Sequence, residues 1–146
     1  MQKRTRIPRV RDCMSPDPPF VAPKDSLQTV IQLLRRRDIR ALPVLEDGKL
    51  VGIVTDRDVR QVAPAYPWFR DEDEIRRYTE NLTVTAAMTA DPLTVAPDAP
   101  LEAAAKILET YRINSLPVIE GEKLVGMLSV ADVLRAFVEQ NEGTAA

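Results

Sequence analysis

The chain contains the same segment twice, and this internal repeat constrains the fold more than any other feature. Residues 14–59 align with residues 88–133 without a gap, and both copies carry Leu-Pro-Val (42–44 and 116–118) and Leu-Val-Gly (50–52 and 124–126). A unit this short usually cannot close its own hydrophobic core, so we expect the two copies to pack on each other. The length of 146 residues suits one domain or two closely packed half-domains.

Each copy predicts an extended stretch followed by an amphipathic helix. The extended stretches are Phe20-Val21 and Thr94-Val95. The helices carry apolar residues on one face, namely Leu27, Val30, Ile31 and Leu34 in the first copy and Leu101, Ala104, Ala105 and Leu108 in the second. Asp25 or Ser26 is expected to cap the first helix, and Asp98 with Pro100 marks the start of the second.

A hairpin and a second helix complete each copy. In the first copy, strands at 42–45 and 50–54 flank Asp47-Gly48, a pair that suits a type I′ turn. Gly121-Glu122 occupies the same place in the second copy and suits a type II′ turn. A helix is then expected to begin near Asp58 and near Asp132.

Composition and charge narrow the classes of function. The net charge of −2 and the pI of about 5.3 offer nothing that attracts nucleic acid. No apolar run reaches the roughly 18 residues of a membrane span, and we expect neither a span nor a signal peptide. Cys13 is the only cysteine, which fits a reducing cytoplasm. Because the chain has no histidine, it lacks the usual general base and the commonest zinc ligand, and we expect no metal site.

The segments outside the copies set the expected boundaries: a basic tail at 1–9, a first motif at 10–61, a connector at 62–83, a second motif at 84–140 and a tail at 141–146. The basic cluster Lys3, Arg4, Arg6, Arg9 and Arg11 is interpreted as a solvated tail or as an anchor for an acidic partner. The connector predicts a short helix with Ile75, Tyr78 and Leu82 on one face, closing core or dimer contacts. Base stacking by Trp68 or Phe69 is not predicted, because no basic groove accompanies them.

The pattern Thr/Ser-x-x-Asp follows the last strand of both copies, as Thr55 with Asp58 and as Ser129 with Asp132. One interpretation is a capping box, which stabilises the start of a helix and needs no ligand. The other is a ligand site, because a helix start offers free N–H groups and an aspartate accepts hydrogen bonds from sugar hydroxyls. One residue can serve both purposes, and the residues alone leave both interpretations open.

The paired motifs "LPV…G.LVGIVT..DV" and "LPV…..LVGMLS..DV", each preceded by an amphipathic helix, resemble tandem CBS (cystathionine β-synthase) domains, a Bateman module, over about residues 10–140. The resemblance implies an α+β fold of two β-α-β-β-α motifs that pack through their sheets about a pseudo-twofold axis. It also implies two clefts between the motifs that commonly take AMP, ADP, ATP or S-adenosylmethionine.

The resemblance further implies which residues bind the ligand. In similar proteins the aspartate of the pattern accepts from ribose hydroxyls, and the Thr or Ser helps to hold phosphate. One cleft would be lined by Thr55, Arg57, Asp58, Leu93, Thr94, Ile113 and Asn114, and the other by Pro19, Phe20, Ile39, Arg40, Met127, Ser129 and Asp132. Arg40 brings a positive charge to the second cleft, where a phosphorylated ligand is expected. Its counterpart in the first cleft, Asn114, is neutral, and Arg57 could supply the missing positive charge there.

By this resemblance the chain is a stand-alone regulatory module that binds an adenosine nucleotide and signals to an unknown partner protein. A cytoplasmic homodimer is expected, without catalytic residues and without a cofactor. The alternative is a ligand-free interaction or scaffold module, in which the two aspartates only cap helices. An enzyme is not predicted, since the sequence shows neither a nucleophile with its base nor ligands at metal spacing.

Overall fold

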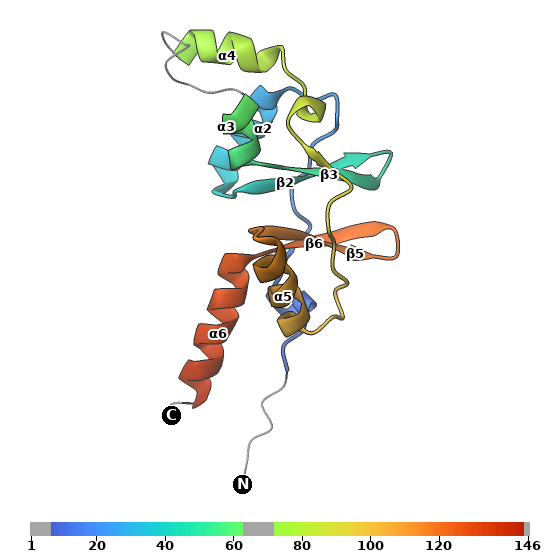
Figure 1. Ribbon diagram of the computed structural model, residues 1–146, viewed down its shortest axis with the longest axis vertical. Helices are drawn as coiled ribbons and strands as arrows, with labels where there is room; N and C mark the ends of the chain where they lie inside the picture. Colours follow the sequence, from blue (N-terminus) through green and yellow to red (C-terminus); the bar gives the residue numbers. More distant parts are fainter. Residues whose placement is uncertain (1–6, 63–71, 145–146) are drawn as a thin grey trace. The chain divides into compact units, whose positions relative to one another are not determined.

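The computed structural model describes residues 7–62 and 72–144 (Figure 1), and it divides the chain into two compact units. The central unit runs from Pro18 to Pro92. The terminal unit combines the described residues up to Asp17 with those from Leu93 onward. Each unit therefore contains most of one copy of the repeat together with the first few residues of the other copy.

The central unit is a three-stranded antiparallel sheet, in the order β2-β3-β4, with helices α2 and α3 packed on it (Figure 1). Its elements are α2 (Leu27–Arg37), β2 (Ala41–Glu46), β3 (Lys49–Thr55), α3 (Asp56–Val62), α4 (Glu72–Glu80), the 3₁₀ helix η1 (Val84–Ala86) and β4 (Thr89–Ala90).

The terminal unit repeats this arrangement, with strands in the order β1-β6-β5 and helices α5 and α6 packed on the sheet (Figure 1). Its elements are α1 (Val10–Cys13), β1 (Ser15–Pro16), α5 (Leu101–Tyr111), β5 (Ser115–Glu120), β6 (Lys123–Ser129) and α6 (Val130–Thr144). The mixed α and β architecture predicted from the sequence is confirmed.

The predicted helix faces form the two cores. Leu27, Val30 and Leu34 of α2 are buried against strand residues such as Leu42 and Val54. In the other unit the corresponding residues Leu101, Ala104 and Leu108 of α5 are buried with Leu116 and Leu128. Ile31 and Ala105 are only partly buried, because they lie at the margin of the apolar stripe. Of the two predicted caps for α2, Ser26 is the N-cap, and its side chain accepts from the N–H of Thr29.

Both predicted hairpin turns are confirmed by their backbone angles. Asp47 and Gly48 both have positive φ, 51° and 78°, as a type I′ turn requires. In the other hairpin Gly121 has a positive φ of 63°, and Glu122 does not have a positive φ. A type II′ turn requires this combination. The predicted extended stretches also form, since Val21 and Val95 make parallel bridges to Val44 and Val118.

The short strand at the start of each copy joins the sheet of the other copy, which the sequence did not predict. Thr89 and Ala90 of β4 pair with Ile53 and Gly52 of β3. In the same way Ser15 and Pro16 of β1 pair with Met127 and Gly126 of β6. The glycine of Leu-Val-Gly makes this approach possible, because a Cβ on Gly52 would lie 3.0 Å from the carbonyl oxygen of Thr89.

Two members of the N-terminal basic cluster are held in place. The Arg9 guanidinium donates to the carbonyl oxygen of Asp98 at 2.8 Å, and that of Arg11 donates to the Asp98 carboxylate. These contacts secure α1 near the start of α5, so the expectation of a solvated tail is wrong for Arg9 and Arg11. Lys3, Arg4 and Arg6 lie outside the described residues.

The predicted connector helix is present as α4, which packs on α2, but it ends at Glu80, before Leu82, and Tyr78 is 42% exposed. Thr79 of α4 is completely buried, and its hydroxyl forms a 2.8 Å hydrogen bond with the side-chain oxygen of Gln28 on α2. Leu82 packs against the core of the central unit. Trp68 and Phe69 lie outside the described residues. None of the helices in the described ranges is both long and apolar enough to cross a membrane.

Candidate functional site

The junction between β3 and α3 forms a complete capping box. The N–H of Thr55 donates to Oδ2 of Asp58 at 2.9 Å, and the N–H of Asp58 donates to the hydroxyl oxygen of Thr55 at 3.1 Å. The next residue, Val59, is buried in the core of the central unit. The predicted capping role of Thr55 and Asp58 is confirmed.

The junction between β6 and α6 has the same reciprocal geometry. The N–H of Ser129 donates to Oδ2 of Asp132 at 2.8 Å, and the N–H of Asp132 donates to the hydroxyl oxygen of Ser129 at 3.2 Å. Asp132 is a buried charged residue, with 8% of its surface exposed. A buried carboxylate needs such partners, because its desolvation is costly otherwise. Both copies of the pattern are therefore capping boxes in this structure.

The residue before each hairpin lies beside the box of its own unit. The N–H of Asp56, the first residue of α3, donates to the carbonyl oxygen of Arg40 at 3.0 Å. The equivalent bond in the terminal unit runs from the N–H of Val130 to the carbonyl oxygen of Asn114. Arg40 therefore lies next to Thr55 and Asp58 within the central unit.

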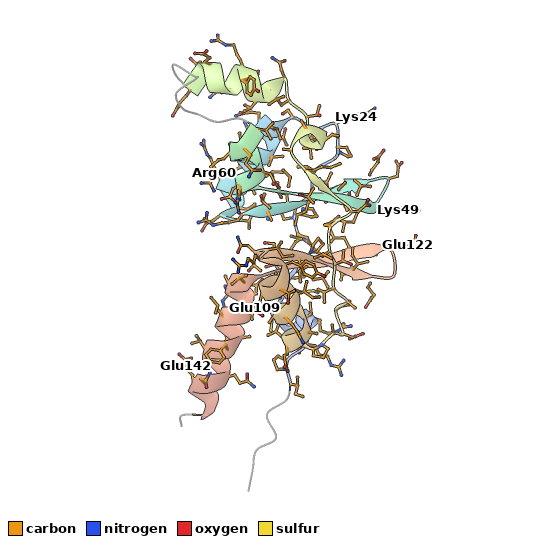
Figure 2. The ribbon with its side chains drawn as sticks, in the orientation of Figure 1. Lys24, Lys49, Arg60, Glu109, Glu122 and Glu142 are labelled. Carbon is orange, nitrogen blue, oxygen red and sulfur yellow. The ribbon has the colours of Figure 1, made fainter. Side chains whose placement is uncertain are left out.

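The charges around the two boxes differ. In the central unit Asp56 forms ion pairs with Arg40 at 3.2 Å and with Arg60 at 3.5 Å; Arg60 is labelled in Figure 2. Since Val130 takes the place of Asp56 in the terminal unit, this charge cluster has no counterpart there. Instead, Arg135 donates to Oδ1 of Asp132 at 3.1 Å.

The remaining predicted site residues range from exposed to buried. Arg57, Thr94 and Asn114 are exposed, and Pro19 is partly buried. Phe20 and Leu93 are exposed by 58% and 43%. Ile39 and Ile113 are partly buried and pack against the cores of their units. Met127 is buried in the middle strand of its sheet.

Each predicted cleft combines residues of both units. The central unit holds Pro19, Phe20, Ile39, Arg40, Thr55, Arg57 and Asp58, and the terminal unit holds Leu93, Thr94, Ile113, Asn114, Met127, Ser129 and Asp132. The structure brings each capping box together with its own neighbours. That the two sets meet across the units stays a prediction.

Three residues of these surroundings were missed by the sequence reasoning: Asp56, Arg60 and Arg135. The signal was present, since Arg60 and Arg135 lie four and three residues after a carboxylate on the same helix. Across 7–62 and 72–144, no group of three or more His, Cys, Asp or Glu residues could hold a metal ion.

Comparison with known proteins identifies the fold. The family model of the CBS domain matches residues 10–64 and 84–139. Inosine-5′-monophosphate dehydrogenase of Korarchaeum cryptofilum is 38% identical over 114 residues, which cover 77% of this chain and 21% of that enzyme. The chain thus spans about a fifth of the length of this relative.

Solved structures of similar chains agree. CBSX2 of Arabidopsis thaliana, solved in complex with AMP, is 30% identical with a TM-score of 0.74, and the match covers 90% of this chain and 97% of that one. The CBS domain pair of MJ0100, solved with 5′-methylthioadenosine and S-adenosyl-L-methionine, is 26% identical with a TM-score of 0.74 and covers 92% of this chain and 99% of that one. The chain therefore belongs to the CBS domain family and contains two CBS motifs.

Proposed function

We propose that this chain is a regulatory module that binds an adenosine nucleotide (AMP, ADP or ATP) or S-adenosylmethionine in clefts between its two CBS motifs and signals to a partner protein in the cytoplasm. The observation that carries the proposal is the duplicated pair of boxes, Thr55 with Asp58 and Ser129 with Asp132. Each presents a carboxylate and a hydroxyl at the junction of a strand and a helix.

The chemistry of these groups suits a nucleoside. A carboxylate is a strong acceptor for the two hydroxyls of a ribose, and the exposed guanidinium groups of Arg40 and Arg57 suit a phosphate. The exposed Phe20 and Leu93 offer apolar surface for a base. The complexes of CBSX2 with AMP and of MJ0100 with S-adenosyl-L-methionine support this ligand class.

The proposal does not include catalysis. The relative from Korarchaeum cryptofilum is an enzyme, but the match covers only a fifth of its length. We therefore propose a regulatory role for this chain, as a module that responds to a ligand.

One observation favours a second candidate function, a ligand-free scaffold. Both boxes are satisfied by their own backbone N–H groups, so the aspartates have a structural role that needs no ligand. A scaffold predicts that no adenosine compound stabilises the fold.

We further propose that the module is a homodimer. On α6 the apolar residues Leu134, Phe137 and Val138 lie at positions i, i+3 and i+4, and they are exposed by 58%, 64% and 52%. Such a stripe on one helix face is typical of a surface that packs against another protein. A second copy of this chain is the occupant that we propose.

The binding proposal is tested by thermal unfolding with AMP, ATP or S-adenosylmethionine. Because a ligand at 100 times its Kd stabilises the folded state by about 2.7 kcal/mol, at least one compound should raise the melting temperature. The double variant Asp58→Asn/Asp132→Asn should lose this rise.

Asp25→Asn is the matched control, since Asp25 Oδ2 accepts from the N–H of Ala22 at 2.8 Å with the same three-residue spacing but outside the proposed site. This variant should keep the ligand-induced rise. Wild-type protein that melts at the same temperature with and without all three compounds would favour the scaffold.

A further inference from the structure

The two CBS motifs hold their key aspartates in different ways. Asp58 uses Oδ2 for the capping box, and its Oδ1 has no partner among the residues that the structure describes. Asp132 uses Oδ2 in the same way, but its Oδ1 accepts from the guanidinium of Arg135 at 3.1 Å. The residue equivalent to Arg135 in the first copy is Gln61, which has no charge.

This difference decides which carboxylate oxygen a sugar can use. A ribose that binds Asp58 finds one oxygen open. At Asp132 both oxygens already accept hydrogen bonds, so the hydroxyls must displace Arg135 or share its acceptor. The capping bond is the harder one to break, because it satisfies a backbone N–H at the start of α6. Arg135 is therefore the group with which a ligand at this motif must compete for Oδ1 of Asp132.

The ion pair is not needed for the fold of the motif. The side chain of Arg135 is 63% exposed, whereas that of Asp132 is 9% exposed. The central unit builds the same strand–helix junction with Gln61 at this position. The arginine therefore changes the availability of the carboxylate without a structural requirement for its charge.

We propose that Arg135 lowers the affinity of the second motif by competing with the ligand's sugar for Asp132, so that a nucleoside without phosphate binds the Thr55/Asp58 motif more tightly than the Ser129/Asp132 motif. This inference rests on the proposed function, because it concerns the same two motifs. It makes Arg135 a positioning residue that acts through Asp132.

Isothermal titration with adenosine tests the inference, because adenosine has the ribose but no phosphate that a positive charge could attract. In the Asp58→Asn background only the second motif keeps its carboxylate. Adding Arg135→Gln should tighten the remaining binding about two- to fivefold, the range that follows from about 0.4–1 kcal/mol for an ion pair whose arginine is exposed. An unchanged or weaker affinity would overturn the inference.

The reciprocal change gives a matched control in the other motif. In the Asp132→Asn background, Gln61→Arg should weaken adenosine binding by a similar factor, because the new guanidinium can reach Oδ1 of Asp58 from the same helical position. The changes in adenosine affinity caused by Arg135→Gln and by Gln61→Arg should both be smaller at 0.5 M NaCl, since salt screens exposed charges. Equal adenosine affinities with and without Gln61→Arg would contradict the proposed competition between an arginine at this helical position and the sugar.

The result also separates the two proposals. In one outcome Asp58→Asn and Asp132→Asn weaken adenosine binding, but Arg135→Gln and Gln61→Arg do not change it. This outcome would leave the proposed function standing and overturn the role of Arg135. Wild-type protein that binds no adenosine compound would overturn both.

Discussion

Replacing Gly126 with alanine should destabilise the protein, because this glycine allows β1 to lie against β6. An added Cβ would lie 2.9 Å from the carbonyl oxygen of Ser15 and 3.0 Å from Cγ of Met14. The methionine side chain can rotate away, but the carbonyl belongs to the backbone of β1. That strand must therefore move, and its register with Gly126 and Met127 is disturbed.

The size of the effect follows from two opposing contributions. Overpacking a tight site costs about 1–3 kcal/mol. Alanine in a strand regains about 0.5–1 kcal/mol relative to glycine, since glycine loses more backbone entropy on folding. The two ranges combine to a net loss in the free energy of unfolding of about 0–2.5 kcal/mol. Because the clash involves a backbone carbonyl, we expect the upper part of this range, about 1–2 kcal/mol. Gly52→Ala should cost slightly less, because its nearest backbone atom, the carbonyl oxygen of Thr89, is at 3.0 Å.

Urea denaturation followed by circular dichroism measures this loss. With a slope of about 2 kcal/mol/M, the midpoint of Gly126→Ala should fall by about 0.5–1 M. If both alanine variants were as stable as the wild type or more stable, the account of the exchanged strands would be wrong.

Three further predictions concern other parts of the chain. Thr79→Val should cost about 1–2 kcal/mol in urea denaturation, because it leaves the side-chain oxygen of Gln28 without its 2.8 Å partner; an unchanged midpoint would contradict this. Burial, helped by the nearby negative charges of Asp12, Asp132 and Glu139, raises the pKa of the Cys13 thiol. Its reaction with a disulfide reagent should therefore rise at a higher pH in the folded protein than in urea, and a coincident or lower midpoint would contradict the assignment. Phe137→Glu should convert the proposed dimer to a monomer in sedimentation equilibrium without loss of stability, whereas a wild type that is monomeric at about 100 μM would refute the dimer.

Much of the fold could be predicted from the sequence, because the repeat and the local signals agree. The period of the apolar residues gave the faces of α2 and α5, and the turn residues gave both hairpins. The capping boxes could also be predicted, since a cap depends on residues three positions apart.

The exchange of the leading strands could not be predicted in the same way. Ser15 and Gly126 are far apart in the sequence, and strands of two residues have no periodicity of their own. The one signal was the glycine of Leu-Val-Gly, which marks the close approach of another backbone but does not say which one. The charge environment of the site was likewise missed, because the sequence reasoning did not consider Arg135, which lies three residues after Asp132 on the same helix.

Adenosine recognition by the two aspartates is tested most directly by isothermal titration of the wild type, Asp58→Asn/Asp132→Asn and Asp25→Asn with AMP, ATP and S-adenosylmethionine. We predict saturable heat with at least one of these compounds for the wild type and for Asp25→Asn, and its loss in the double variant. Equal binding by all three proteins, or no binding by the wild type, would show that both carboxylates serve only to begin helices.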